Sequence, residues 1–170
     1  MTSFLVMSDT HGLTNEIEKI KKRHSFDFLI HCGDSELDFR SKEMEGFLKV
    51  RGNCDFDSNY PNEVIEEVDG LKLFVTHGHL FNIKSSPLAL SYRGDEVQAK
   101  LICFGHTHIA GSEWIDGKVF LNPGSVRLPR GKYPASYSVL YWDNSGRELN
   151  VEFRDLEGNL IEGLSEVYKL

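Results

Sequence analysis

Four short apolar runs, each followed closely by a polar residue, constrain the fold of this chain more than any other feature. The runs FLVM, FLI, LFV and LICF are followed within a few residues by Asp9, Asp34, His77 and His106. Short apolar runs bounded by turn residues are typical of buried β-strands. In open α/β sheets, ligands bind where the carboxyl ends of the strands meet the loops. The pattern therefore predicts an α/β fold whose functional residues meet at one sheet edge.

The first fifty residues have the pattern of a strand, a helix and a second strand. Between the first two apolar runs, residues 14–24 carry Ile17 and Ile20 among charged residues, which indicates a surface helix. Two strands joined by a helix favour a parallel sheet. A second, weaker helical pattern covers residues 36–47, and residues 48–50 are then expected to form a third strand.

Two β-hairpins are predicted in the middle of the chain. Asp69-Gly70 and Asp116-Gly117 each lie between two strand-like stretches. An Asp-Gly pair in that position favours a type I′ turn. The predicted hairpins join residues 63–68 to residues 71–76, and residues 114–115 to residues 118–121.

The remaining elements complete one α/β domain over residues 1–170. Residues 101–104 are expected to form a buried strand, and residues 136–142 and 148–154 alternate like antiparallel strands. Residues 87–98 allow a helix that contains Gly94. The chain shows no repeat, linker or low-complexity stretch. We therefore expect a single domain with two mixed β-sheets packed face to face and helices outside.

Composition and charge exclude several classes of protein. The chain has 170 residues and a formal net charge of −7, which argues against stable binding of nucleic acid. Its three cysteines, Cys32, Cys54 and Cys103, are widely spaced, so we expect neither a disulfide framework nor a thiolate zinc site. The apolar residues 4–7 are too few for a membrane span or a signal peptide. We therefore expect a cytoplasmic protein with no membrane partner.

Residues with metal-binding side chains recur in an ordered set of short motifs. Asp9-Thr10-His11 and His106-Thr107-His108 each place two ligands on one face of an extended backbone. Glycines beside the motifs permit close backbone approach. Taken singly, a residue such as Asp34 is more often a helix cap or a turn residue. Together the motifs, which also include Gly33-Asp34, Gly52-Asn53 and Thr76-His77-Gly78-His79, supply oxygen and nitrogen ligands for two metal ions.

This ordered set resembles the calcineurin-like metallophosphoesterase superfamily. The stretches Gly52-Asn53-Cys54-Asp55, His77-Gly78-His79 and Asn122-Pro123-Gly124-Ser125 are similar to its small YfcE-type phosphodiesterases. The resemblance spans about residues 4–142 and implies a four-layer αββα sandwich of two mixed sheets flanked by helices. It also implies one metal site of Asp9, His11, Asp34 and His108, and a second of Asp34, Asn53, His77 and His106, so that Asp34 is shared.

The resemblance implies hydrolysis of small phosphodiesters at a binuclear metal centre. Two divalent ions about 3.5–4 Å apart hold the phosphate and lower the pKa of a bridging water, which attacks phosphorus as hydroxide. Manganese is the metal that the resemblance suggests, while iron, cobalt, nickel and zinc also suit these ligands. Asn53 can donate a hydrogen bond to a phosphoryl oxygen, and His79 is expected either to orient His77 or to contact the substrate.

Cys54 stands where many members of the superfamily carry a histidine that protonates the leaving group. A thiol with a pKa of about 8.5 is smaller than imidazole and donates only a weak hydrogen bond. We therefore expect a preference for good leaving groups, and for diesters over alkyl monoesters. YfcE-type relatives share this cysteine, in line with the same interpretation.

Two other functions are compatible with such a fold. One is a non-catalytic scaffold for protein contacts, like the retromer subunit of eukaryotic vacuolar sorting, which has lost part of the ligand set. The other is a phosphomonoesterase or phosphoprotein phosphatase. The intact ligand set argues against the first alternative, and Cys54 argues against the second.

Several further residues have competing interpretations. Phe56, Tyr60 and Phe81 either mark an interface in a homo-oligomer or belong to the core. Arg127 and Arg130 either bind a substrate phosphate or are ordinary exposed loop residues. We expect His31, Cys32 and Cys103 to be structural.

Overall fold

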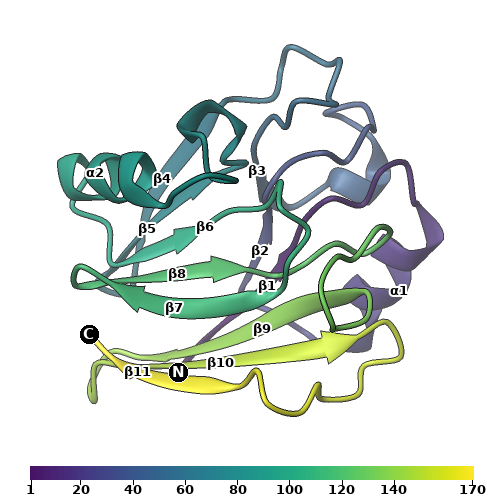
Figure 1. Ribbon diagram of the computed structural model, residues 1–170. Helices are drawn as coiled ribbons and strands as arrows, with labels where there is room; N and C mark the ends of the chain where they lie inside the picture. Colours follow the sequence, from purple (N-terminus) through teal and green to yellow (C-terminus); the bar gives the residue numbers. More distant parts are fainter.

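Two β-sheets of six and five strands pack face to face in the computed structural model, which describes residues 1–170 (Figure 1). The facing sides of both sheets supply the largest group of buried apolar side chains, including Phe4, Leu73 and Leu101. Strands buried on both faces have nearly continuous apolar sequences, and this explains the short apolar runs.

The six-stranded sheet has the order β11-β10-β9-β1-β2-β3. Its strands β1, β2 and β3 are parallel, and β9 runs antiparallel to β1. The last strand, β11, was not predicted from the sequence. The strands are β1 (Thr2–Met7), β2 (Phe28–His31), β3 (Phe47–Lys49), β9 (Ser136–Asp143), β10 (Glu148–Asp155) and β11 (Glu166–Lys169).

The five-stranded sheet has the order β4-β5-β6-β8-β7. Its three central strands β5, β6 and β8 are parallel, and the two edge strands are antiparallel to their neighbours. Both sheets are therefore mixed, as predicted. The strands are β4 (Glu63–Val68), β5 (Leu71–Thr76), β6 (Leu101–Cys103), β7 (Gly111–Ile115) and β8 (Lys118–Asn122).

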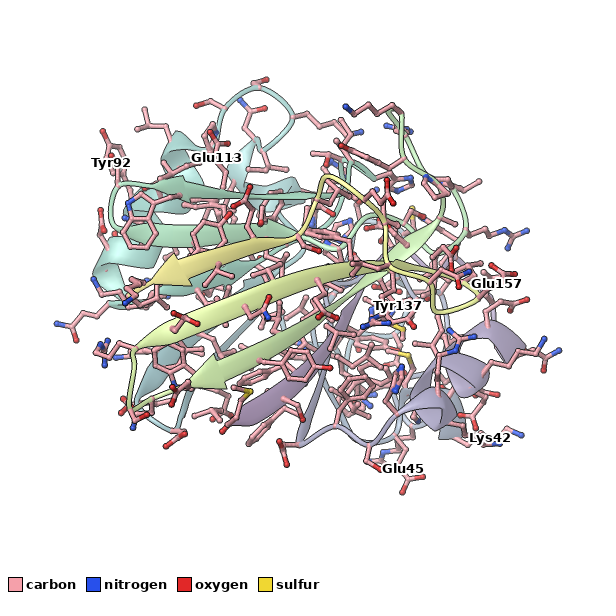
Figure 2. All side chains as sticks on the ribbon, turned by 90° about the horizontal axis from the view of Figure 1, so that it is seen from below. Lys42, Glu45, Tyr92, Glu113, Tyr137 and Glu157 are labelled. Carbon is pink, nitrogen blue, oxygen red and sulfur yellow. The ribbon has the colours of Figure 1, made fainter.

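One helix covers the outer face of each sheet. Helix α1 (Asn15–Arg23) buries Ile17 and Ile20 against the six-stranded sheet. Helix α2 (Leu88–Glu96) packs Leu90 against the five-stranded sheet. In Figure 2 the labelled Tyr92 of α2 lies on the side of the molecule opposite α1. This arrangement confirms the four-layer αββα sandwich. Neither helix is long and apolar enough to cross a membrane.

Both predicted hairpins are present with their turns at the expected residues. The φ angles are 49° at Asp69 and 72° at Gly70, and 48° at Asp116 and 75° at Gly117. A type I′ turn requires positive φ at both central residues, so the Asp-Gly prediction is confirmed.

The helix predicted over residues 36–47 is wrong. Only a short 3₁₀ turn, η1 (Lys42–Met44), forms in this segment, and Glu36 has a left-handed φ of 56°. Side chains of a later loop bind the backbone that a helix would use: the N–H of Glu36 donates to Asp55 and that of Phe39 donates to Asp57, each at 2.8 Å. Tertiary contacts therefore override the weak helical pattern.

The residues expected to be structural are buried. His31, Cys32 and Cys103 are fully buried, and all three cysteines are free thiols. Of the three aromatic residues considered for an interface, Tyr60 is buried and Phe81 packs edge to face against the buried Phe74, so both belong to the core, whereas Phe56 is 91% exposed.

Candidate metal centre

The candidate ligands follow the carboxyl ends of strands from both sheets. In the six-stranded sheet they come after β1, β2 and β3, and in the five-stranded sheet they come after β5 and β6. Parallel strands deliver their following loops to the same edge, and the two edges meet. The residues are Asp9, His11, Asp34 and Asn53 from the first sheet, and His77, His106 and His108 from the second.

The extended backbone predicted for Asp9-Thr10-His11 and His106-Thr107-His108 is wrong. Asp9, His11, Asp34, His106 and His108 all have left-handed φ angles between 41° and 70°. Such angles cost energy in residues other than glycine and cluster at functional sites, where neighbouring structure enforces them. Here hydrogen bonds between the loops provide that enforcement: the N–H of Asp9 donates to the Gly33 carbonyl and that of His11 to the Asp34 carbonyl, both at 3.0 Å.

A first group of side chains contains Asp9, His11 and His108. The Oδ1 atom of Asp9 lies 3.0 Å from Nε2 of His108 and 3.7 Å from Nε2 of His11. The other ring nitrogen of each histidine is already engaged, because Nδ1 of His108 lies 2.7 Å from the Leu128 carbonyl and Nδ1 of His11 lies 2.9 Å from Glu36. The Nε2 atoms of both rings therefore face the carboxylate of Asp9.

A second group contains Asp34, Asn53 and His77. Nε2 of His77 lies 3.1 Å from Oδ2 of Asp34 and 3.1 Å from Oδ1 of Asn53. Nδ1 of this ring lies 2.7 Å from the Cys32 carbonyl, to which it donates. The arrangement repeats the first group: an imidazole is fixed by a carbonyl on one side and presents Nε2 to oxygen atoms on the other.

Asp34 connects the two groups. Its Oδ1 accepts the N–H of Cys54 at 2.8 Å, which leaves Oδ2 to face the histidines. This Oδ2 lies 3.1 Å from Nε2 of His77 and 4.0 Å from Nε2 of His11. A single carboxylate oxygen thus faces one ring from each group.

Among the predicted histidine and aspartate ligands, His106 alone lies outside the closest groups of ligand atoms. Its backbone N–H donates to Oδ2 of Asp9 at 3.1 Å, and its ring centroid lies 5.1 Å from that of His77. Burial, followed by the charges of His77 and Lys84, lowers the pKa of His106 to about 4. The ring is therefore a neutral imidazole beside the second group.

The other two predicted catalytic residues also border the centre. The His79 ring centroid lies 5.4 Å from that of His77, and its buried Nδ1 has no hydrogen-bond partner. Burial lowers the pKa of His79. The Cys54 thiol lies within 4.8 Å of ligand atoms of His11 and Asp34. Burial, and then the charge of Asp34, raises the pKa of Cys54 to about 11, so the thiol keeps its proton.

The carboxylates and imidazoles shift one another's protonation. Burial raises the pKa of Asp9, but the adjacent His108 and His11 lower it by more, so it falls below its ordinary value. Asp9, with help from Glu36 and against the effect of burial, raises the pKa of His11 to about 9. The site therefore holds ionised carboxylates that attract positive charge.

Asp55 organises the loops of the six-stranded sheet, and nothing in the sequence pattern singled it out for this role. This buried carboxylate accepts N–H groups from Asp34 at 2.9 Å, Glu36 at 2.8 Å and Gly52 at 2.7 Å. Gly52 must approach closely, since a Cβ there would lie 2.0 Å from Oδ1 of Asp34. Only the folded arrangement identifies Asp55 as the residue that positions Asp34.

Asn122 and Ser125 support the loops from the other side. Nδ2 of Asn122 donates to the Gly105 carbonyl at 3.1 Å and to Oγ1 of Thr107 at 2.9 Å. The Ser125 hydroxyl donates to the Asp9 carbonyl at 2.7 Å. The Arg127 guanidinium donates to the His11 carbonyl, so this arginine has a structural contact. Asn122-Pro123-Gly124-Ser125 is thus more than a turn, because it holds both ligand-bearing loops in place.

A four-layer α/β sandwich with histidine, aspartate and asparagine side chains at its strand ends fits a metal-dependent hydrolase. The model of the calcineurin-like phosphoesterase superfamily domain matches residues 2–145. The chain is 47% identical to "Probable metallophosphoesterase YsnB" of Bacillus subtilis over 162 residues, which cover 94% of this chain and 95% of that one. The chain therefore belongs to the calcineurin-like phosphoesterase superfamily, which confirms the family and the enzyme class predicted from the sequence.

Further similarities agree with this assignment. The crystal structure of a conserved uncharacterized protein from Streptococcus pneumoniae TIGR4, described as a predicted phosphoesterase, superposes with a TM-score of 0.94 at 33% identity, covering 99% of this chain and 98% of that one. "Phosphodiesterase YfcE" of Escherichia coli K12 is 38% identical over 104 residues, 55% of this chain and 51% of that one. Vacuolar Protein Sorting 29 of Cryptosporidium parvum shares the fold alone, with a TM-score of 0.75 at 18% identity over 98% of this chain and 95% of that one.

Proposed function

We propose that this protein is a phosphodiesterase that hydrolyses small phosphodiesters and depends on two divalent metal ions. The superfamily and the similarity to a phosphodiesterase support this proposal. The observation that carries it is Oδ1 of Asp9, a buried oxygen without a hydrogen-bond partner. Nε2 atoms of three imidazoles surround it at 3.0 Å, 3.7 Å and 3.8 Å, from His108, His11 and His77.

These side chains fit a cation. A neutral imidazole whose Nδ1–H donates to a carbonyl carries a lone pair on Nε2. In the neutral state His77 and His108 both have this arrangement, and each Nε2 then faces carboxylate or amide oxygens that also carry lone pairs. Such acceptors repel one another when buried unless a positive charge lies between them.

We assign the ligands as two sets that share Asp34. Asp9, His11 and His108 belong to the first set, and Asn53 and His77 to the second. Asp34 would be held in common by both sets, and its Oδ2 faces His77 and His11 while Oδ1 accepts the N–H of Cys54. We place His106 with the second set, since its ring lies beside that of His77.

The chain's own groups bind and orient the substrate phosphate. Bound divalent ions would supply positive charge at the phosphate and, in the hydroxide mechanism expected from the sequence, lower the pKa of the attacking water. Asn53 contributes no charge, so two carboxylates leave the loaded centre positive and attractive to an anionic diester. The Nδ2 group of Asn53 points toward Cys54 at 3.5 Å from its Sγ and is available to a phosphoryl oxygen.

Cys54 restricts the leaving group. A thiol whose pKa is raised to about 11 keeps its proton and is a poor acid for an alkoxide that departs near neutral pH. His79 lies within the same group of rings and, with its pKa lowered, is neutral. Esters with good leaving groups are therefore cleaved faster than alkyl monoesters.

The remaining parts of the proposal concern the metal, the location and the partners. We propose manganese as the working ion, with iron, cobalt, nickel and zinc as substitutes suited to imidazole and carboxylate ligands. We propose that residues 1–170 act as one domain in the cytoplasm on small diesters. The net charge of −7 supports the expectation that the protein does not bind nucleic acid stably. A homo-oligomer, for which the exposed Phe56 is a candidate contact, is compatible with this activity.

A matrix of metals against substrates tests the proposal. Purified protein is assayed with Mn, Fe, Co, Ni and Zn on bis-p-nitrophenyl phosphate and on an alkyl phosphomonoester, together with Asp34→Ala and Cys54→His. We expect diester hydrolysis that requires metal and is abolished by Asp34→Ala, and a gain of monoesterase activity in Cys54→His. Full diesterase activity in Asp34→Ala, or faster cleavage of the alkyl monoester by the wild type, contradicts the proposal.

A further inference from the structure

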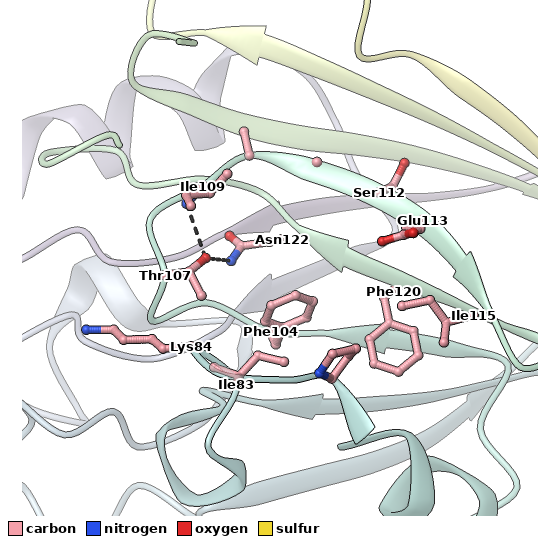
Figure 3. A pocket seen from close by; sticks show the side chains of 13 residues that line it. Ile83, Lys84, Phe104, Thr107, Ile109, Ser112, Glu113, Ile115, Phe120 and Asn122 are labelled. Atoms are coloured by element: carbon pink, nitrogen blue, oxygen red, sulfur yellow. Dashed lines mark hydrogen bonds between the residues drawn. The ribbon is translucent and has the colours of Figure 1, made fainter. Parts of the chain in front are cut away.

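A groove lies beside the candidate metal centre, on the outer face of the five-stranded sheet (Figure 3). Its volume is about 380 Å³, within the range of about 300–1,000 Å³ that is typical of small-molecule sites. None of the candidate ligands lines it. The groove is instead bounded by β7, β8 and the residues that follow η2 (His79–Phe81).

One end of the groove adjoins the candidate ligands. Thr107, which lies between His106 and His108 in the sequence, is part of the groove wall. Its Oγ1 is held by Nδ2 of Asn122 at 2.9 Å, as Figure 3 shows. Lys84 lines the groove as well, and its charge acts on His106. A substrate whose phosphate lies at the ligands can therefore extend a substituent into the groove.

The floor of the groove is aromatic and apolar. Phe104 and Phe120 meet edge to face, with ring centroids 6.3 Å apart and an interplanar angle of 73°. Ile83 and Ile115 extend the apolar lining. Phe120 is 3% exposed and packs in the core below α2, so the floor is formed before any ligand binds. A preformed corner of two rings suits a flat apolar group better than a flexible charged one.

Gly111 keeps the groove open. It pairs with Asn122 at the start of β7, and the alternation of the strand places it on the face that carries Glu113. A Cβ at Gly111 would meet nothing within 4 Å, and its φ lies outside the left-handed region, so the backbone does not require glycine. A glycine within a strand often marks a place where a ligand approaches closely.

We propose that this groove binds one aromatic ester substituent of the phosphodiester, while the phosphate lies at the candidate metal centre. The inference rests on the proposed function and narrows its substrate class to aryl-like or nucleobase-bearing diesters. The occupant is a small molecule because the groove is continuous with the ligand loop through Thr107.

The test compares two phosphonates that differ only in the substituent. Binding of phenylphosphonate and methylphosphonate to the manganese-loaded protein is measured by calorimetry. Burying a ring instead of a methyl group should make phenylphosphonate bind about tenfold more tightly. The series Gly111→Ala, Gly111→Val and Gly111→Leu fills the groove in steps. The ratio of phenylphosphonate affinity to methylphosphonate affinity should fall as the side-chain volume rises, to less than about twofold in Gly111→Leu. The affinity for methylphosphonate should stay within about twofold of the wild-type value.

Glu67→Leu, at an exposed position of β4 on the opposite edge of the same sheet, is the matched control and should keep the full preference. If Gly111→Leu does not fold, Gly111→Val replaces it as the test variant, because a branched side chain is favoured in a strand. Equal binding of both phosphonates by the wild type, an unchanged preference in the folded variants, or equal loss of both ligands overturns the inference. A change of oligomeric state without a change of preference also overturns it, because the groove would then be a contact between copies.

Hydrolysis of bis-p-nitrophenyl phosphate by the wild type separates this inference from the proposed function. An active diesterase without a phenyl preference contradicts only the groove assignment. A protein that prefers phenylphosphonate but hydrolyses no diester with any metal contradicts the proposed function.

Discussion

The two sheets contribute different chemistry to the same centre. The edge of the six-stranded sheet supplies both carboxylates, Asp9 and Asp34, whereas the edge of the five-stranded sheet supplies only imidazoles, from His77, His106 and His108. The aromatic groove also lies on the five-stranded side. In the proposed centre, the first edge would therefore provide the negative charge for cations, and the second would combine imidazole ligands with the groove proposed for a substrate substituent.

The buried residues that support the two edges differ in the same way. The Asp55 carboxylate, behind the six-stranded edge, accepts three hydrogen bonds, and all three come from backbone N–H groups. Asn122, behind the five-stranded edge, donates to two acceptors and accepts from Gly124. A charged acceptor that holds three donors makes stronger hydrogen bonds than a neutral amide. The carboxylate edge is thus expected to be the more rigid one.

The largest effect should come from removing the shared charge. Asp34→Asn keeps the shape of the side chain but removes the negative charge that faces both His77 and His11, so kcat/KM for bis-p-nitrophenyl phosphate should fall by about 10³-fold or more. His106→Gln removes only a peripheral imidazole and should cost about 10²-fold. Steady-state kinetics with saturating manganese measure kcat/KM for both variants. A larger loss in His106→Gln than in Asp34→Asn would contradict the greater importance of the carboxylate edge.

The second prediction concerns stability. Asp55→Ala leaves three buried N–H groups without their charged acceptor and should lower the free energy of unfolding by about 3 kcal/mol. Asn122→Ala removes neutral hydrogen bonds and should lower it by about 1–2 kcal/mol. Urea denaturation of both variants and the wild type gives the values. If Asn122→Ala is the more damaging change, the carboxylate edge is not the more rigid one.

A smaller effect is expected from Glu36, which lies 2.9 Å from Nδ1 of His11. Glu36→Gln keeps a hydrogen-bond acceptor but removes the charge that makes the ring a stronger ligand, so manganese affinity should fall about tenfold. In His77 and His108, Nδ1 instead contacts a backbone carbonyl. The contact between a carboxylate and Nδ1 therefore occurs only at His11, on the six-stranded edge. Calorimetric titration with manganese measures the change, and Glu18→Gln in α1, whose carboxylate pairs with Lys21 and Lys22 and with no candidate ligand, is the control. Equal manganese affinities in Glu36→Gln and Glu18→Gln would show that the Glu36 carboxylate does not strengthen His11 as a ligand.

The smallest predicted effect is a pH-dependent change in stability caused by His31, at the end of β2. His77, which follows β5 in the other sheet, is also buried and provides the contrast. Burial lowers the pKa of His77, but Asp34 raises it by more, whereas burial alone dominates at His31 and lowers its pKa to about 4. His31 instead meets the Thr10 hydroxyl at 3.0 Å and accepts the Gly33 N–H at 3.2 Å, which fixes the neutral ring.

The unfolded chain takes up a proton at His31 near pH 6.5 while the folded chain does not, so stability falls as the pH drops from about 6.5 toward 4. Between pH 6.5 and 5.5 the wild type should lose about 1 kcal/mol more than His31→Gln. Urea denaturation at the two pH values measures this difference. Equal losses would show that His31 is protonated in the folded protein.

Much of the fold follows from local patterns in the sequence. The strands that carry Asp9, His77 and His106 are short apolar runs, and the two Asp-Gly turns need only the conformational freedom of their own residues. The helix expected over residues 36–47 fails because Asp55 and Asp57, from a distant loop, bind its backbone. The edge strand β11 carries little apolar burial and so leaves no strong pattern.

The sequence alone determined which residue types stand at the strand ends, since side-chain chemistry and strand periodicity are local properties. It thereby determined the superfamily, the layered fold and the seven candidate ligands, whose roles stay predictions. Only the tertiary structure decided that Oδ2 of Asp34 faces both His77 and His11, that Asp55 positions the loops, and that an aromatic groove opens beside Gly111. These facts depend on distances between segments far apart in the chain, and folding of the whole chain sets those distances.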